Sequence, residues 1–228
     1  MHNTEEEIRS CIVVLVGVTA DTRKVTSVRR FFESNFQGTT LVPDMPQRKG
    51  MHRCAEWLLD DLASEDVFGR FSAVHFLNYI SGGFVFRLAA EGISQDRIGR
   101  VVYARGPIQE LVPRALVRRY TWPLVRLTQG KMVTDLAGKR VADVPPCPLG
   151  RQAGLLIETG TSDLARSLGL GPQSVPQEAW EPEAMLPGAA DVLRVPESHD
   201  DVYTSEHVLN AVLSFFRSGQ FHPFGATG

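Results

Sequence analysis

Residues 71–87 carry the types and spacing that best suggest chemistry. The segment opens with an apolar run typical of a buried strand, turns through glycines just after Ser81, and continues as an apolar, helix-capable stretch. Such a sharp turn between strand and helix can hold a nucleophile above a sheet for attack on a carbonyl. A serine nucleophile needs a base, and His199, with its neighbours Asp200 and Asp201, is the histidine best suited to that role.

The register of this turn argues against a simple serine nucleophile. The pattern G-x-S-x-G places its last glycine on Gly82, its nucleophile on Ile80 and its first glycine on Asn78. An isoleucine cannot attack a carbonyl. If Ser81 were used instead, the bulky Tyr79 would stand where close packing normally needs a glycine.

Strands and helices are predicted to alternate along the chain. Apolar runs typical of buried strands occur at 11–16, 39–42, 74–77, 98–104, 154–157 and 192–195. Apolar residues recur at helical spacing in 25–36, 50–62, 84–90 and 204–219. Segments 78–83 and 162–188 are predicted as a turn and a loop. This alternation predicts an α/β fold with a mostly parallel central sheet and helices on both faces.

The length of 228 residues suits a single domain spanning 1–228. A basic, amphipathic stretch at about 108–140 interrupts the alternation of strands and helices. We expect this stretch to be a helical insertion over the carboxyl ends of the strands, where ligands bind in open α/β sheets. Two interpretations stay open: a short lid over a pocket, or surface helices whose arginines are solvated.

Composition excludes several classes of function. The net charge of -2 offers no electrostatic case for binding nucleic acid or an anionic membrane surface. The apolar run 11–18 is too short to span a membrane. Cys11, Cys54 and Cys147 are scattered without metal spacing, which is typical of a reduced, cytoplasmic protein. Gly17 stands alone after its strand, so no dinucleotide cofactor is predicted. His52, His207 and His222 are isolated and no pair has metal spacing, so no metal is predicted either.

Several motifs together resemble the lipase- and esterase-like α/β-hydrolases of bacteria. They are VVLVGV at 13–18, HFLNYISGG at 75–83, ARGP at 104–107, LPGAADVLRVPESH at 186–199 and EHVLNAVLSFFRSGQF at 206–221. The resemblance spans roughly 11–221 and implies an α/β-hydrolase fold with a helical lid.

The resemblance also assigns positions to catalytic parts. His199 stands where the family has its base, and Ile80 stands where it has its serine. The acid is expected in 171–176, which contains no carboxylate, so the triad is predicted to be degenerate with its acid missing. Other carboxylates that could replace the acid are Glu158, Asp163, Glu178, Glu181 and Glu183.

The oxyanion and pocket region is predicted around five residues: Gly17, Val18, Thr19, Tyr79 and Gly82. The family's His-Gly pair after the first strand is Gly17-Val18 in this chain, so the oxyanion region is altered as well.

Three functional hypotheses follow. The preferred one is a pseudo-hydrolase without serine-hydrolase activity, in which Ile80 forms the floor of a site for a small apolar or acyl-bearing ligand. A protein partner or a second copy of the chain is the other kind of occupant considered. The first alternative is an active carboxylic-ester hydrolase using Ser81 with His199. The second is a non-hydrolytic enzyme using His199 as an acid or base.

Overall fold

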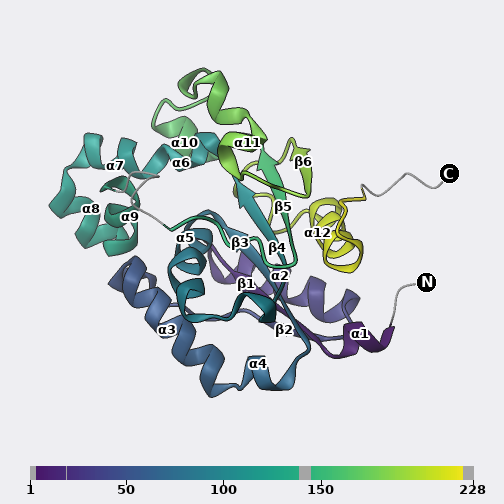
Figure 1. The fold of residues 1–228 in the computed structure, drawn as a ribbon. Helices are drawn as coiled ribbons and strands as arrows, with labels where there is room; N and C mark the ends of the chain where they lie inside the picture. Colours follow the sequence, from purple (N-terminus) through teal and green to yellow (C-terminus); the bar gives the residue numbers. More distant parts are fainter. Residues whose placement is uncertain (1–3, 19, 139–144, 223–228) are drawn as a thin grey trace.

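The computed structural model describes residues 4–18, 20–138 and 145–222. Six strands form one sheet in the order β2-β1-β3-β4-β5-β6, and every neighbouring pair is parallel (Figure 1). The strands are β1 (Ser10–Leu15), β2 (Thr39–Leu41), β3 (Ala73–Tyr79), β4 (Ile98–Arg105), β5 (Gln152–Glu158) and β6 (Asp191–Val195). The predicted parallel α/β sheet is thus confirmed.

Four longer helices cover the two faces of this sheet. They are α2 (Thr22–Asn35), α3 (Met51–Ser64), α5 (Ile80–Ala89) and α12 (Glu206–Ser218). Alternate side chains of β3 point to opposite faces, as the strand period of two requires. Val74 and Phe76 pack with residues of α3 and α5, whereas Leu77 and Tyr79 pack with residues of α2 and α12. Apolar layers therefore lie on both sides of the sheet.

The remaining helices are short. They are α1 (Thr4–Ile8), α4 (Val67–Arg70), α6 (Pro107–Glu110), α7 (Val112–Tyr120), α8 (Trp122–Gln129), α9 (Lys131–Gly138), α10 (Asp163–Ser167) and α11 (Pro182–Met185). We call α7, α8 and α9 the cap helices; they project from one side of the molecule (Figure 1). The helical character predicted for the insertion is confirmed within 108–138, and residues 139 and 140 lie outside the described residues.

Two local predictions were wrong. The segment 162–188 is not simply a loop, because it contains α10 and α11. The segment 78–83 is not a separate turn either, because β3 continues to Tyr79 and α5 begins directly at Ile80.

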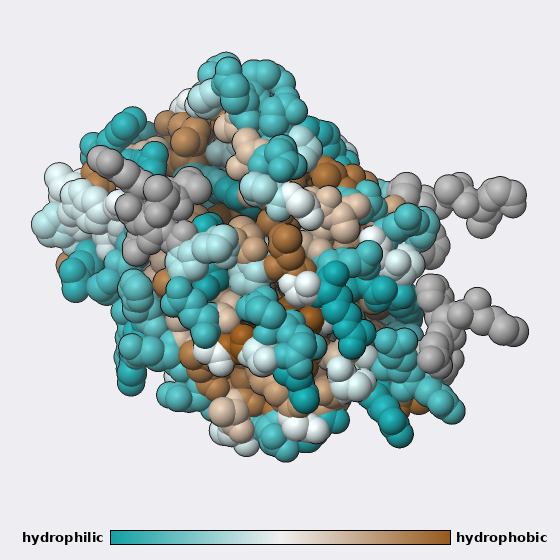
Figure 2. Space-filling view, viewed as in Figure 1, coloured by the Kyte–Doolittle hydropathy of each residue, from teal (hydrophilic) through white to brown (hydrophobic). Residues whose placement is uncertain are grey.

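Hydrophilic residues cover much of the face shown in Figure 2, with hydrophobic residues between them. Within 4–18, 20–138 and 145–222, no helix has the length and apolar character needed to cross a membrane.

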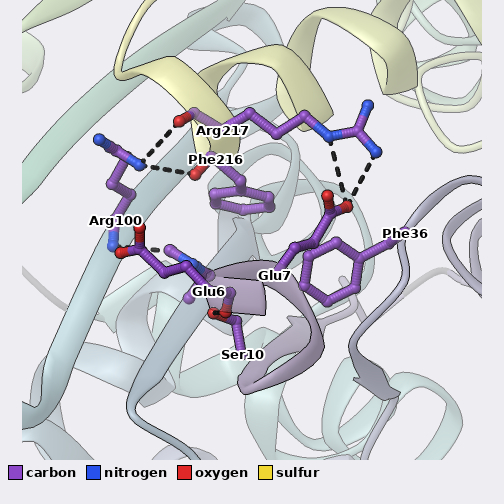
Figure 3. Close-up of a pocket in the computed structure, with 8 residues that line it drawn as sticks. Glu6, Glu7, Ser10, Phe36, Arg100, Phe216 and Arg217 are labelled. Carbon is purple, nitrogen blue, oxygen red and sulfur yellow. Dashed lines mark hydrogen bonds and ion pairs between the residues drawn. The ribbon is translucent and has the colours of Figure 1, made fainter. Parts of the chain in front are cut away.

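The amino edge of the sheet has a small pocket of about 90 Å³ crossed by charged side chains (Figure 3). The guanidinium of Arg217, at the end of α12, donates to the carboxylate of Glu7 at 2.8 Å. Arg100 of β4 donates to the carbonyl of Phe216 at 2.8 Å. These bonds connect α1, β4 and α12 at the edge of the sheet opposite to Ile80. The side chains around this pocket therefore stabilise the packing of these elements.

His75 also lines this pocket, and its buried imidazole has a hydrogen-bond partner. Its Nδ1 accepts a hydrogen bond from the backbone N–H of Arg100 at 2.9 Å, and its ring lies 5.2 Å from that of Phe216. Burial, together with the positive charge of Arg100, lowers the pKa of His75 from 6.5 to about 3. The imidazole is therefore neutral at physiological pH.

Replacing His75→Gln, which keeps a hydrogen-bond acceptor, should reduce the pH dependence of stability. The pKa of His75 is lower in the folded chain, so the unfolded chain takes up the proton first and stability falls as pH drops from 6.5 towards about 3. Urea denaturation at pH 7 and pH 5 should show the parent losing about 2 kcal/mol more than the variant. His52→Gln on the exposed face of α3 is the control, and an equal pH dependence in parent and His75→Gln would contradict the prediction.

Candidate functional site

Backbone pairing beyond the ends of β5 and β6 brings together two residues distant in sequence. The N–H of Thr159 donates to the carbonyl of Val195 at 2.9 Å, and the N–H of Gly160 donates to the carbonyl of Glu197 at 3.1 Å, so the ladder continues past the last residues of both strands. Glu158, at the end of β5, therefore meets His199, which follows β6, at the carboxyl edge of the sheet.

The His199–Glu158 pair has the geometry of a base and its orienting acid. Nδ1 of His199 lies 3.1 Å from Oε2 of Glu158 and 3.3 Å from Oε1. Both side chains are buried, with exposed fractions of 4% and 1%. Because a carboxylate only accepts hydrogen bonds, Nδ1 carries the proton and Nε2 presents its lone pair. This is the relation that orients the histidine in catalytic triads.

The prediction that the acid is missing was therefore wrong, because a carboxylate lies within hydrogen-bond distance of His199. The carboxylate beside His199 is Glu158, one of the five substitutes weighed from the sequence, and not a residue of 171–176. The signal for it was weak: an acidic residue at the end of an apolar run, with nothing local to show which of several carboxylates reaches the histidine.

The acidic neighbours of His199 have other partners. Nζ of Lys24 lies 2.5 Å from Oδ1 of Asp200, and the hydroxyl of Ser198 donates to Oδ2 of Asp201 at 2.6 Å. These contacts anchor the loop that carries His199 to α2 and to itself.

Gly17 leaves room for the imidazole. A Cβ at this position would lie 3.2 Å from Nε2 of His199 and 2.7 Å from the hydroxyl of Tyr203. The N–H of Gly17 donates to that hydroxyl at 2.9 Å. Tyr79 stacks on Tyr203 with ring centroids 4.0 Å apart, and burial raises the pKa of both phenols, so both stay protonated. Thr19, also assigned to this region, lies outside the described residues.

Ser81 is buried, and its hydrogen-bond partner is a backbone group and not the histidine. Its Oγ accepts from the backbone N–H of Val18 at 2.9 Å, its exposed fraction is 2%, and no hydrogen bond joins it to His199 among the described residues. Gly82 packs directly on the carbonyl of Leu15, where a Cβ would overlap. The N–H of Val18, a residue of the predicted oxyanion region, is thus bound to Ser81.

Ile80 begins α5 without the backbone strain of a nucleophile elbow. In the part of the chain that the structure describes, positive φ angles at residues other than glycine occur at Asp66 and Thr121, and not at Ile80. A β-branched residue strongly disfavours positive φ, which explains the relaxed junction.

The side chain of Ile80 lines a pocket of about 520 Å³ between α5, the cap helices and the segment before β6. Most of its lining is apolar and includes Ile80, Phe84, Leu111, Leu136, Val175 and Met185. A mostly apolar pocket with a few polar groups is typical of sites for small organic molecules.

A small recess of about 20 Å³ adjoins this pocket, and Ile80, Phe84, Arg105 and Glu110 line both spaces. Within the described residues, neither Oδ1 nor Nδ2 of the buried Asn78, which also lines the recess, has a hydrogen-bond partner. From the sequence, Asn78 was identified only as the residue that replaces the first glycine of the G-x-S-x-G pattern.

Three charged side chains line the recess: Arg87, whose guanidinium donates to the carbonyl of Pro145, and the ion pair of Arg105 with Glu110. The guanidinium of Arg105 donates to both carboxylate oxygens of Glu110 at 2.7 Å, and also to the carbonyl of Met185 at 2.5 Å. Burial acts to lower the pKa of Arg105, but the charge and hydrogen bonds of Glu110, with smaller contributions from Cys147 and Tyr103, together raise it, so the guanidinium stays charged. The recess thus presents the unpaired amide of Asn78 beside one ion pair and the guanidinium of Arg87.

The three cysteines are free, and the described part of the chain contains no cluster of three or more histidine, cysteine or acidic residues that could hold a metal ion.

Neither a protein-family model nor a curated protein matches this sequence. The structure is similar to that of the mature lipase BlEst2 of Bacillus licheniformis, with 15% identity, a TM-score of 0.61, and coverage of 92% of this chain and 93% of that one. It is also similar to Est1E from Butyrivibrio proteoclasticus, with 15% identity, a TM-score of 0.56, and coverage of 94% and 87%.

A third similar structure belongs to a group described as novel epoxide hydrolases from metagenomes of hot environments. The identity is 16%, the TM-score is 0.55, and 94% of this chain and 92% of that chain are covered. At these identities the likeness establishes a shared fold, and it extends over nearly the whole chain.

Removing the hydroxyl of Ser81 should destabilise the fold. In Ser81→Ala the N–H of Val18 loses its acceptor, so we expect the free energy of unfolding to fall by about 1 to 2 kcal/mol. Urea denaturation followed by circular dichroism measures this change. Ser34→Ala, on the exposed face of α2, should stay within about 0.5 kcal/mol of the parent. A loss no larger than that of the control would mean that the bond does not stabilise the junction.

Proposed function

We propose that this chain, which has the α/β-hydrolase fold predicted from its sequence, is a ligand-binding protein without serine-hydrolase activity. The observation that carries the proposal is the position of Ile80. It occupies the nucleophile's place in the register and its side chain forms part of an apolar pocket of about 520 Å³. The chain thus offers a ligand a surface to pack against where a hydrolase offers it a nucleophile.

The surroundings of Ser81 support this proposal. Acyl transfer requires a nucleophile within reach of the base and backbone donors aimed at the developing oxyanion. The Oγ of Ser81 accepts from Val18 and makes no hydrogen bond to His199 among the described residues. The hydrogen bond from Val18 to Ser81 therefore occupies both the hydroxyl that would have to act as nucleophile and a backbone N–H of the predicted oxyanion region.

The lining of the pocket indicates the chemistry of the ligand. The apolar walls favour a hydrocarbon body, because removing apolar surface from water is the main source of affinity in such sites. The recess has room for about one water molecule, so only the outermost polar atom of a head group would enter it. Its unpaired amide, Asn78, favours a neutral head group that both donates and accepts hydrogen bonds, such as a carboxamide.

The cap helices serve in this proposal as the lid predicted from the sequence. They are attached to the rest of the chain by polar contacts at the start of α3: the N–H of Met51 donates to the carboxylate of Asp135 at 3.0 Å. Arg48 also donates to the carbonyl of Leu127 at 2.9 Å. These bonds hold the cap helices beside the pocket.

The intact His199–Glu158 pair favours a second candidate function. An oriented imidazole with a free Nε2 lone pair is suited to proton transfer. This supports an enzyme that uses His199 as an acid or base, with or without Ser81 as the nucleophile. Against it, His199 lines neither the pocket above Ile80 nor the adjoining recess.

A fluorophosphonate probe separates these two candidates. We expect no mass increase in the intact parent, because Ser81 is buried and bonded to Val18. Ser81→Ala and His199→Ala are the matched controls. Labelling of the parent that disappears in both variants would overturn the proposed loss of serine-hydrolase activity and support an active hydrolase.

The ligand preference can be measured by displacement of the apolar fluorophore N-phenyl-1-naphthylamine. Decanamide should displace it better than methyl decanoate by about three- to tenfold, the equivalent of one net hydrogen bond to Asn78. In Asn78→Leu the preference should vanish. The same variant should be at least as stable as the parent, because an apolar side chain of similar shape removes two unpaired polar atoms.

Two variants report on the pocket as a whole. Ala179→Trp should abolish fluorophore binding by filling the pocket, whereas Ala190→Trp, exposed at the amino edge, should leave it unchanged. Absence of fluorophore binding in the parent would contradict the ligand-binding proposal. Binding without an amide preference would contradict only the role of Asn78.

A further inference from the structure

Exposed hydrophobic side chains gather at the junction of α7 and α8. Of the six large hydrophobic residues that are exposed in the described part of the chain, four lie within eight positions: Tyr120, Trp122, Leu124 and Leu127. Their exposed fractions range from 44% at Tyr120 to 72% at Leu127. We call residues 118–127 the cap tip. A group of apolar side chains kept in water normally marks an interaction site.

The cap tip is also strongly basic. The cap tip itself contains three arginines and no aspartate or glutamate, although the whole chain has a net charge of -2. Residues 111–134 add Arg114 and Lys131 and no acidic residue, and Lys131 pairs with Asp135 just beyond them. Arg118, Arg119 and Arg126 of the cap tip are exposed. The net charge of the whole chain gave no electrostatic case for binding an anionic surface. Positive charge is nevertheless concentrated at the cap tip.

The backbone holds the two exposed aromatic residues at a constrained corner. Thr121 lies between Tyr120 and Trp122 with φ 67° and ψ 153°, a region that glycine alone adopts readily. The guanidinium of Arg119 lies 5.6 Å from the ring centroid of Tyr120. Aromatic and basic groups are thus presented together.

A basic hollow adjoins the cap tip. Lys49 and Arg126 line it together with Leu127 and Pro123. A phosphate group above this hollow would find positive charge beside apolar surface, which is the combination that a phospholipid headgroup and its first methylenes present.

We propose that the cap tip docks this protein on an anionic lipid surface. Tyrosine and tryptophan favour the boundary between water and hydrocarbon, leucines insert below it, and arginines pair with lipid phosphates. Each basic side chain near an anionic membrane contributes about 1 kcal/mol. The complete lack of acidic residues in 111–134 favours a uniformly anionic lipid surface over a protein partner, whose surface normally carries both signs of charge.

Docking in this way would place the pocket above Ile80 close to the lipid, because the cap helices contribute to its lining through Arg114 and Leu136. An amphipathic ligand could then enter from the membrane. This last step rests on the proposed ligand-binding function, whereas docking itself does not.

Cosedimentation of the whole chain with vesicles tests the proposal. The parent should sediment with vesicles of phosphatidylcholine and phosphatidylserine, weakly with phosphatidylcholine alone, and less well in high salt. Arg118→Glu combined with Arg119→Glu should lower the partition coefficient about tenfold or more. Trp122→Ala combined with Leu127→Ala should weaken binding comparably, because it removes the inserted apolar surface.

The matched control reverses two exposed arginines of α2, with Arg23→Glu and Arg30→Glu, and so makes the same change in net charge. It should reduce vesicle binding much less than the cap-tip pair. Equal effects of the two pairs, or no binding of the parent to anionic vesicles, would overturn the proposal. A parent that binds no vesicles and forms a dimer dissolved by Trp122→Ala with Leu127→Ala would instead identify the cap tip as a contact between copies.

Discussion

The packing of Gly82 against the carbonyl of Leu15 determines where the first turn of α5 lies. A side chain at this position would overlap the backbone of β1, so only glycine allows helix and strand to approach so closely. This approach brings the Oγ of Ser81 to the N–H of Val18 and leaves Ile80 in the lining of the pocket. The character of the whole site therefore depends on one missing Cβ.

The site retains polar groups whose burial is costly. Glu158 and His199 are both removed from water, and Asn78 is buried with neither side-chain amide atom paired among the described residues. Burying polar groups costs free energy that only their partners can offset. Glu158 orients the imidazole of His199. The unpaired amide of Asn78 lies in the recess beside the apolar pocket.

Local sequence patterns predicted the sheet well because each strand is decided by its own composition. The apolar, β-branched run 11–16 became β1 (Ser10–Leu15), buried on both faces as expected. The same reasoning failed at 162–188, where α10 and α11 have only five and four residues. Helices of that length show no periodicity and are stabilised by tertiary contacts, so no local pattern reveals them.

The sequence by itself determined the order of the six strands and four longer helices, the basic amphipathic insertion and the presence of isoleucine at the position that the G-x-S-x-G register gives to the nucleophile. Those properties depend on residue type and short-range spacing. Only the tertiary structure decided that Glu158 accompanies His199, 41 residues away, and that the N–H of Val18 binds Ser81, 63 residues away. It also decided that Asn78 remains unpaired. These contacts are made by strands that pair across the sheet and by the helix packed on it, and pairing between distant segments leaves no mark on the local pattern of either one.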